Sequence, residues 1–130
     1  MAVLLAAVML VSQAIDVTPA AEPETVIETV EVEEPVVVKL TPREYLYAAY
    51  PSLARRLDCM IRLESTWYAA ASGAGGRYIG LAQFDRPTWA ETPQGKAGAS
   101  RTDPYASIDA MAWGVRNLGY GRWPVTSRRC

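Results

Sequence analysis

The chain contains no histidine and only two cysteines among its 130 residues. Because histidine nitrogens and cysteine sulfurs are the usual ligands of zinc, this scarcity gives little support to a metal centre, and we expect no cofactor. The sequence also has no basic helix, RNA-binding motif or zinc-site spacing, so nucleic acid is a poor candidate for a partner.

Charge of one sign is missing from part of the chain. Residues 16–38 carry seven acids and no base, and they lack aromatic side chains. This composition predicts a largely disordered, acidic linker over residues 15–40. From Lys39 onward, thirteen bases accompany seven acids, which leaves an excess of six positive charges. With half of its residues hydrophobic, the chain has room for one compact domain, which we place at 41–130.

The N-terminus has no apolar run long enough to cross a bilayer comfortably. Residues 1–11 are uninterruptedly apolar, whereas a spanning helix needs about 20 such residues. Small residues follow, as in a secretory signal peptide that ends at residue 14, or as late as residue 21. The start lacks the usual Lys or Arg. We predict a signal peptide and a secreted, extracytoplasmic protein, and cleavage or retention of the segment stays open.

The two cysteines, Cys59 and Cys130, fit an exported protein. An even number of cysteines in a small exported chain favours one disulfide, with two unpaired thiols as the alternative. The bond would tie the middle of the chain to its last residue. For a loop of this length, the chain-entropy account gives about 4 kcal/mol of stabilisation.

Local signals predict a mainly α-helical domain. Thr41, Pro42 and Glu44 form a capping box, in which threonine and glutamate satisfy free amides at a helix start. Similar signals mark later elements. The expected elements are a helix at 42–50, an amphipathic helix at 52–68, a glycine-rich loop or minimal β-hairpin at 72–80, a short helix after Asp85, an exposed loop at 92–101, and a last substantial helix that begins at Asp103-Pro104 and packs on the helix at 52–68.

Glu64 lies on the apolar side of the helix expected at 52–68. On a 3.6-residue period it shares a stripe with apolar and aromatic residues, whereas Arg55, Asp58, Arg62 and Ser65 point away. Burial disfavours the charged form, so the pKa of such a carboxyl rises above about 4.3 and the group can act as a general acid. The alternative is a structural glutamate at the rim of the stripe. The stripe consists of Leu57, Met60, Ile61, Glu64, Trp67 and Tyr68.

Three motifs follow one another along the domain. The first is Glu64-Ser65, the second is Gly80-Leu81-Ala82-Gln83-Phe84 with Pro87 and Trp89 after it, and the third runs from Asp103 to Trp113. In this order they resemble the lysozyme-like soluble lytic transglycosylase family, close to secreted transglycosylases and resuscitation-promoting-factor-like domains. The resemblance covers about residues 53–123. It implies a small lysozyme-like, goose-type helical domain that cleaves peptidoglycan.

The resemblance implies that Glu64 protonates the β-1,4 glycosidic oxygen between N-acetylmuramic acid and N-acetylglucosamine. A conventional glycosidase needs a second carboxylate, but none occurs between Glu64 and Gly80. Asp85 and Asp103 are better explained as helix caps. A single acid favours transglycosylation, in which the substrate supplies its own nucleophile and leaves a 1,6-anhydromuramyl end. Hydrolysis by a water that Asp85 or another acid orients stays open.

The family also implies substrate-binding residues. We expect Gln83 to present its amide to the sugar, and Ser65 to hydrogen-bond near the acid, with a loop-stabilising amide as the alternative for Gln83. Two of four aromatic residues should lie in the groove, the rest belonging to the core. The four are Tyr78, Trp89, Tyr105 and Trp113.

The positive excess of the domain suits anionic peptidoglycan strands as the partner of a monomer associated with the cell wall. Two rival functions stay open. One is a lysozyme-like module that binds the wall without cutting it. The other is an adaptor in a secretion or phage-entry apparatus, which would contact other proteins through the acidic linker.

Overall fold

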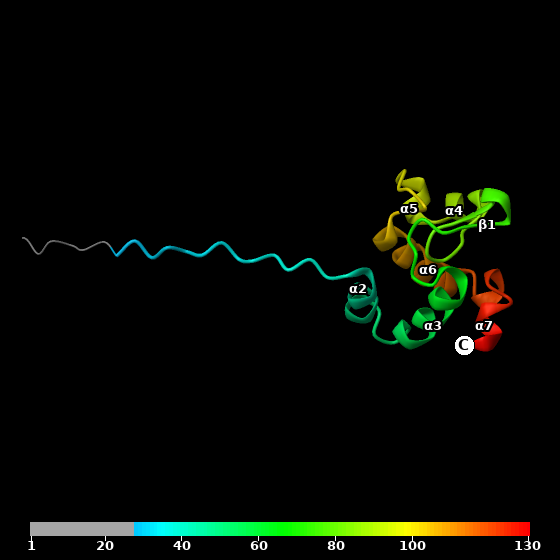
Figure 1. The fold of residues 1–130 in the computed structure, drawn as a ribbon, viewed down its shortest axis with the longest axis horizontal. Coiled ribbons are helices and arrows are strands. Elements are labelled where there is room, and N and C mark those ends of the chain that lie inside the picture. The colour runs from blue at the N-terminus through cyan, green and yellow to red at the C-terminus, as the bar shows by residue number, and fades with distance from the viewer. Residues whose placement is uncertain (1–27) are drawn as a thin grey trace, which may run out of the picture. The chain divides into compact units, whose positions relative to one another are not determined.

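The structure is a computed structural model that describes residues 28–130 (Figure 1). The predicted signal peptide and the first part of the predicted linker, residues 15–27, lie outside the described residues. Residues 28–40 contain no helix or strand and are exposed. A compact unit comprises Val37–Cys130, and the described residues 28–36 do not belong to it. Within residues 28–130, none of the helices is sufficiently long and apolar to cross a membrane.

The compact unit begins with two helices that the sequence anticipates. Helix α2 spans Pro42–Ala49, and its capping box forms as predicted between Thr41 and Glu44. Helix α3 spans Ala54–Ser65, so it is shorter at both ends than the predicted 52–68. Thr66 and Trp67 have φ values of 52° and 63°, in the left-handed region that ends a right-handed helix.

A minimal β-hairpin follows α3, in agreement with the prediction for 72–80. Strands β1 (Ser72–Gly73) and β2 (Tyr78–Ile79) are antiparallel, and the 3-10 turn η2 (Ala74–Gly76) joins them. Gly80 ends the hairpin with a φ of 90°. A Cβ atom at Gly80 would lie 2.0 Å from the carbonyl oxygen of Arg101, so only glycine lets the two segments approach this closely.

The second half of the unit is helical. Asp85 caps α4 (Arg86–Glu91) and Asp103 caps α6 (Pro104–Asn117), as predicted. The prediction of an exposed loop at 92–101 is wrong in its first half, because Thr92 caps the one-turn helix α5 (Pro93–Lys96). The Thr92 side chain is fully buried, accepts from the Gly95 amide and donates to the carbonyl oxygen of Trp89.

The C-terminal stretch is more regular than the sequence suggests. It contains the 3-10 turn η3 (Tyr120–Arg122) and the four-residue helix α7 (Thr126–Arg129). The predicted disulfide between Cys59 and Cys130 is present, with a Cα–Cα distance of 5.8 Å. It ties the end of α7 to α3, and the two helices lie side by side in Figure 1.

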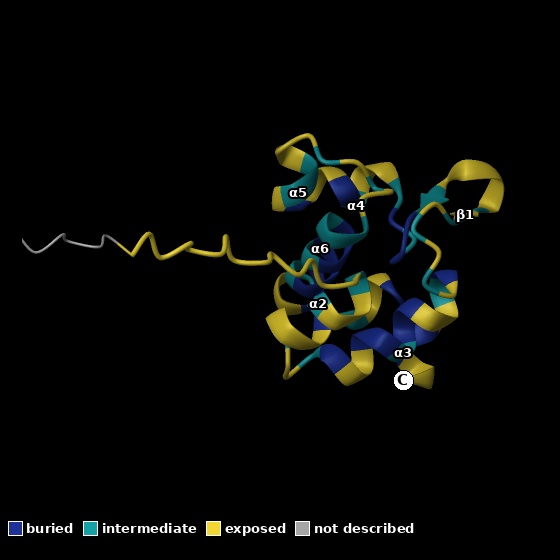
Figure 2. Ribbon diagram, turned by 60° about the vertical axis from the view of Figure 1, so that its left-hand side comes forward, coloured by how far each residue is buried: buried dark blue, intermediate teal, exposed yellow. Residues whose placement is uncertain are grey.

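One hydrophobic core holds these elements together. Helix α3 packs mainly against α2 and α7, whereas α6 packs mainly against α2, α5 and η3. The last substantial helix was expected to pack on the helix of Glu64, and buried residues of α6 and α3 belong to the same hydrophobic cluster. Figure 2 shows the buried faces of α3 and α6 in dark blue. The largest fully buried apolar side chains are Leu46, Leu57, Met60, Ile61, Leu81, Ile108 and Met111.

Candidate functional site

Glu64 lies in the last turn of α3, one residue before the helix ends. Its side chain is half-buried, and its Oε1 accepts a hydrogen bond of 2.7 Å from the hydroxyl of Thr126. Burial raises the pKa of Glu64 above its ordinary value, and the bond from Thr126 opposes this rise only in part. The predicted inward orientation of the carboxyl is confirmed.

The rest of the predicted stripe is only partly confirmed. Leu57, Met60 and Ile61 are fully buried, but Tyr68 is exposed because the helix ends before it. Asp58, expected to point away from the stripe, is buried instead. Its carboxylate accepts hydrogen bonds from three side chains, so burial is compensated. These donors are Arg43, Tyr47 and Trp67.

A cleft of about 430 Å³ opens beside Glu64, and we call it the Glu64 cleft. Three parts of the chain line it. They are the end of α3 (Leu63, Glu64), the hairpin and the turn after it (Tyr78, Gln83), and the C-terminal stretch (residues 122–126 and Arg129). Arg122 and Arg129 are the basic residues of this lining, and Arg122 is paired with Glu91 at 3.3 Å.

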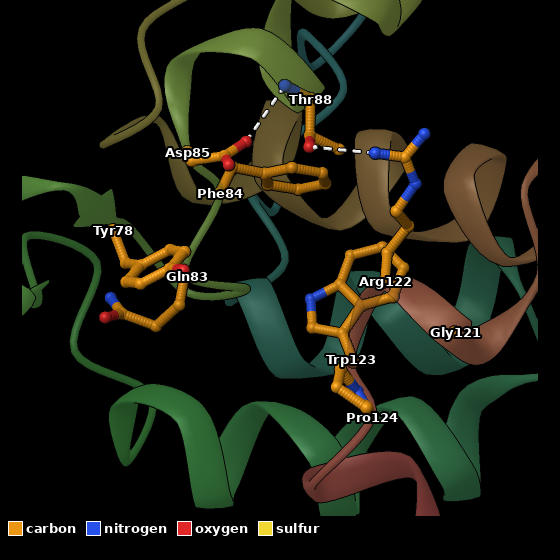
Figure 3. Close-up of a pocket in the computed structure, with 9 residues that line it drawn as sticks. All are labelled: Tyr78, Gln83, Phe84, Asp85, Thr88, Gly121, Arg122, Trp123 and Pro124. Carbon is orange, nitrogen blue, oxygen red and sulfur yellow. Dashed lines mark hydrogen bonds between the residues drawn. The ribbon is translucent and has the colours of Figure 1, made fainter.

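A second cavity of about 320 Å³ adjoins the Glu64 cleft and shares five lining residues with it. Figure 3 shows Tyr78 and Gln83 on one side of this cavity and Arg122, Trp123 and Pro124 on the other. Phe84, Asp85 and Thr88 form its far end. The two cavities together make a groove along the junction between the hairpin and the C-terminal stretch.

The groove holds two carboxylates in different surroundings. Among the described residues that line the Glu64 cleft, Glu64 is the one acid. Asp85 lines the adjoining cavity, and its Oδ1 accepts from the Thr88 amide at 2.9 Å. Hydrogen bonding with Thr88, and then the charges of Arg77 and Arg122, lower the pKa of Asp85. Glu64 is therefore suited to donate a proton, and Asp85 is ionised and engaged as a helix cap.

Two predicted polar contacts serve the fold instead. The hydroxyl of Ser65 is buried and donates to the carbonyl oxygen of Ile61, one turn earlier in α3. Gln83 lines the groove, but its Nε2 donates to the carbonyl oxygens of Ala71 and Gly80. Both amide hydrogens of Gln83 are thus used within the loop, which matches the alternative that the sequence left open.

Of the four predicted groove aromatics, the structure places one, Tyr78, in the groove. Trp89 belongs to the core, where its indole N–H donates to the carbonyl oxygen of Ala99. Tyr105 packs edge-on against Tyr45 and donates its hydroxyl to the carbonyl oxygen of Leu40. Trp113 is half-buried in α6 and does not line the Glu64 cleft. Among these four residues, Tyr78 is thus the one that lines the two cavities described above.

The groove aromatic that sequence reasoning missed is Trp123. It lines both cavities, and its ring is held by an indole hydrogen bond of 2.8 Å to the carbonyl oxygen of Ala82. It packs edge-on against Phe84, and a Cβ atom at Gly114 would lie 2.9 Å from its ring. Gly114 therefore leaves the space that Trp123 occupies.

The C-terminal wall of the groove was also missed. Pro124, Val125, Thr126 and Arg129 all line the Glu64 cleft, and Thr126 touches Glu64 itself. The two cysteines could have predicted this wall from the sequence. Because Cys59 lies one and a half turns before Glu64, a bond to Cys130 must bring residues just before the C-terminus close to α3.

Comparisons of the chain with protein-family models, with curated proteins and with solved structures find no match. Within residues 28–130, no three acidic or cysteine side chains converge in a cluster that could hold a metal ion. The chemistry of the site must therefore be judged from the groove and its side chains.

Proposed function

We propose that this protein cleaves the β-1,4 bond between N-acetylmuramic acid and N-acetylglucosamine in peptidoglycan, by lytic transglycosylation in a lysozyme-like fold. The observation that carries the proposal is Glu64, a half-buried carboxyl with a raised pKa at the edge of an open groove. A protonated carboxyl facing a groove is what a glycosidic leaving group requires. An apparent export signal and the positive excess of the domain support a location at the cell wall.

The reaction uses Glu64 twice. First the carboxyl proton moves to the glycosidic oxygen while the bond from that oxygen to C1 of the muramyl residue breaks. The 6-hydroxyl of the same residue then bonds to C1, and its proton returns to the Glu64 carboxylate. The products are a free N-acetylglucosamine hydroxyl and a 1,6-anhydromuramyl end, so no water is consumed.

The placement of the two acids supports transglycosylation over hydrolysis. Asp85 lines the cavity that adjoins the Glu64 cleft rather than the cleft itself, and its carboxylate caps α4. A hydrolase would need a second acid that orients the attacking water. Asp85 is the one groove acid that this role could fall to, so it is the natural control.

Two matched variants test the proposal on purified peptidoglycan. Glu64→Gln keeps an oxygen that can accept from Thr126 but cannot give up a proton, and we expect it to release muropeptides at least about 100-fold more slowly. Asp85→Asn keeps a good helix cap and should solubilise the wall like the wild type. Equal activity of wild type and Glu64→Gln would overturn the proposal.

Mass spectrometry of the released muropeptides separates the reaction types. Anhydro ends are lighter by one water than hydrolysed ends, and transglycosylation predicts that they dominate. Only reducing ends, together with loss of activity in Asp85→Asn, would establish a hydrolase instead. Binding of wild type and Glu64→Gln to the wall with no release by either would establish a non-catalytic module.

A further inference from the structure

Thr126 is the one residue of the described chain that hydrogen-bonds to the Glu64 carboxyl. It is the first residue of α7, it is 7% exposed, and its hydroxyl donates to Glu64 Oε1 at 2.7 Å. Residues 64 and 126 are far apart in sequence, and no local helix rule brings them together. Their contact therefore depends on how the C-terminal stretch is anchored.

The anchoring of Thr126 comes from α3, the same helix that carries Glu64. Four residues after Thr126, Cys130 is bonded to Cys59 of α3. One residue after it, the carbonyl oxygen of Ser127 accepts from Arg56 Nη2 at 3.0 Å. The Ser127 amide also donates to the carbonyl oxygen of Trp123 at 2.9 Å. Two contacts on the C-terminal side of Thr126 thus hold it against α3.

This bond engages one of the two oxygens of the Glu64 carboxyl and leaves the other free of protein partners in the described structure. A hydroxyl has one hydrogen, and that of Thr126 is given to Oε1. An oxygen that accepts this bond is better suited to be the carbonyl oxygen of the acid. The acidic proton is then favoured on Oε2, to which no described residue hydrogen-bonds.

We infer that Thr126 is a positioning residue that orients the Glu64 carboxyl and directs its acidic proton to Oε2, for delivery to substrate in the groove. This inference rests on the proposed function for its catalytic meaning. The contact itself is a property of the fold and can be tested separately.

The bond also has a defined effect on the acid strength of Glu64. Hydrogen bonding by Thr126 lowers the pKa, against the larger rise that burial causes. The other titratable groups that line the cleft are Tyr78 of β2, Arg122 of η3 and Arg129 of α7. None of these three is hydrogen-bonded to Glu64 in the described structure. Removal of the Thr126 hydroxyl should therefore raise the pKa of Glu64 further.

The test compares Thr126→Val, which keeps the shape and removes the hydroxyl, with Thr126→Ser, which restores it. Peptidoglycan release by Thr126→Val should show a kcat lower by roughly 10-fold or more, because a misplaced acid delivers its proton poorly. The alkaline limb of its pH profile should move to higher pH. Thr126→Ser should recover both properties. Ser127→Ala, whose hydroxyl lies outside the cleft lining, should match the wild type.

A second readout does not depend on enzyme activity. Carbon-13 NMR of the Glu64 carboxyl gives its titration midpoint directly, and this midpoint should be higher in Thr126→Val than in the wild type and in Thr126→Ser. If the valine variant does not fold, Thr126→Ala gives the same two measurements.

The outcomes separate the inference from the proposed function. An unchanged NMR midpoint in Thr126→Val overturns the inference, whatever the activity. An active wild type with an unchanged kcat and pH limb in Thr126→Val overturns the inference but leaves the function standing. The third outcome is a shifted Glu64 midpoint in Thr126→Val when the wild type cleaves no peptidoglycan. It would overturn the proposed function, and with it the delivery of a proton to substrate. The effect of Thr126 on the Glu64 carboxyl would still stand.

Discussion

At the scale of a single residue, the burial of Glu64 suits the proposed function but lowers the stability of the fold. Its carboxyl is half-buried, so the ionised form loses hydration that only one hydrogen bond, from Thr126, replaces. The same burial keeps the proton on the acid at a higher pH than an exposed glutamate would allow. A group that would serve as a general acid is therefore an unfavourable group for the folded state near neutral pH.

This conflict predicts how Glu64→Gln changes stability. Because the folded pKa of Glu64 lies above 4.5, the stabilising contribution of its proton is complete below pH 4.5 and is lost as the pH rises through the folded pKa. The neutral variant does not titrate at this position. We expect Glu64→Gln to gain stability over the wild type near neutral pH, and the difference to shrink below pH 4.5. Urea unfolding at both pH values measures this, and a difference that does not vary with pH contradicts it.

The sequence alone indicated the orientation of Glu64 but not the roles of its neighbours. A helical period is enough to place residue 64 on the side of Met60 and Ile61. The hydroxyl of Ser65 and the amide of Gln83 were expected to face a ligand, and both are engaged by backbone carbonyl oxygens. Which acceptor a polar side chain finds depends on the folded chain, so composition and spacing do not reveal it.

At the scale of the elements, Asp58 connects α3 to α2 and to the turn that follows α3. Its Oδ1 accepts from the Trp67 indole at 2.9 Å, and its Oδ2 accepts from Arg43 of α2 and from Tyr47 of α2. This bond anchors the indole of Trp67, a residue with left-handed backbone just after the helix. Asp58 thereby joins α2, α3 and the turn that follows the last residues of α3, Glu64 and Ser65.

Replacement of Asp58 by alanine should therefore destabilise the protein by about 2 kcal/mol, since it leaves the donors without their charged acceptor. The burial of Asp58 raises its pKa, but the hydrogen bonds from Arg43, Tyr47 and Trp67 outweigh this, and the net pKa is lowered. The wild type should lose the contribution as the pH falls through that lowered value. Urea unfolding of both proteins over the acidic range gives both results.

Arg43→Ala is the matched control for Asp58. It removes the salt bridge of 2.7 Å, but the Arg43 side chain is 64% exposed, so screening by solvent weakens the pair. Arg43→Ala should therefore lower the free energy of unfolding much less than Asp58→Ala does. If the two variants were equally destabilised, the bond to the Trp67 indole would have no special role.

The starts of α2, α4 and α6 were predictable in this chain, whereas α5 and α7 were not. A start is signalled within four residues, as by Thr41 before α2 and Asp103 before α6. The end of α3 has no such local signal, and the turn after it is tied back to the helix by a bond across nine residues, from Trp67 to Asp58. Helix α7 is a single turn, too short to be stable alone, so only its anchorage to α3 accounts for it.

At the scale of the whole molecule, the disulfide connects two helices that both contribute to the proposed site. It joins α3, which carries the proposed acid, to α7, which carries one wall of the groove. The sequence predicted this bond from two cysteines, but the wall that it holds was not predicted.

Loss of the bond should therefore affect activity as well as stability. The chain-entropy account gives a loss of about 4 kcal/mol for a closed loop of 71 residues. Cys130→Ser, or reduction of the wild type, should lower the urea midpoint. Because a freed α7 no longer presents Thr126 to Glu64, the muropeptide release should fall even at temperatures where the unfolding transition has not begun.

The paired variant Cys59→Ser/Cys130→Ser separates this effect from other actions of a reductant, because it has no thiol left to reduce. Its activity should equal that of the reduced wild type and should not change on addition of reductant. The Glu64 titration midpoint, followed by carbon-13 NMR, should rise in both, since each loses the bond from Thr126 that lowers the pKa. A reduced protein that keeps full activity and an unchanged midpoint would show that packing of α7 on α3 holds the groove without the disulfide.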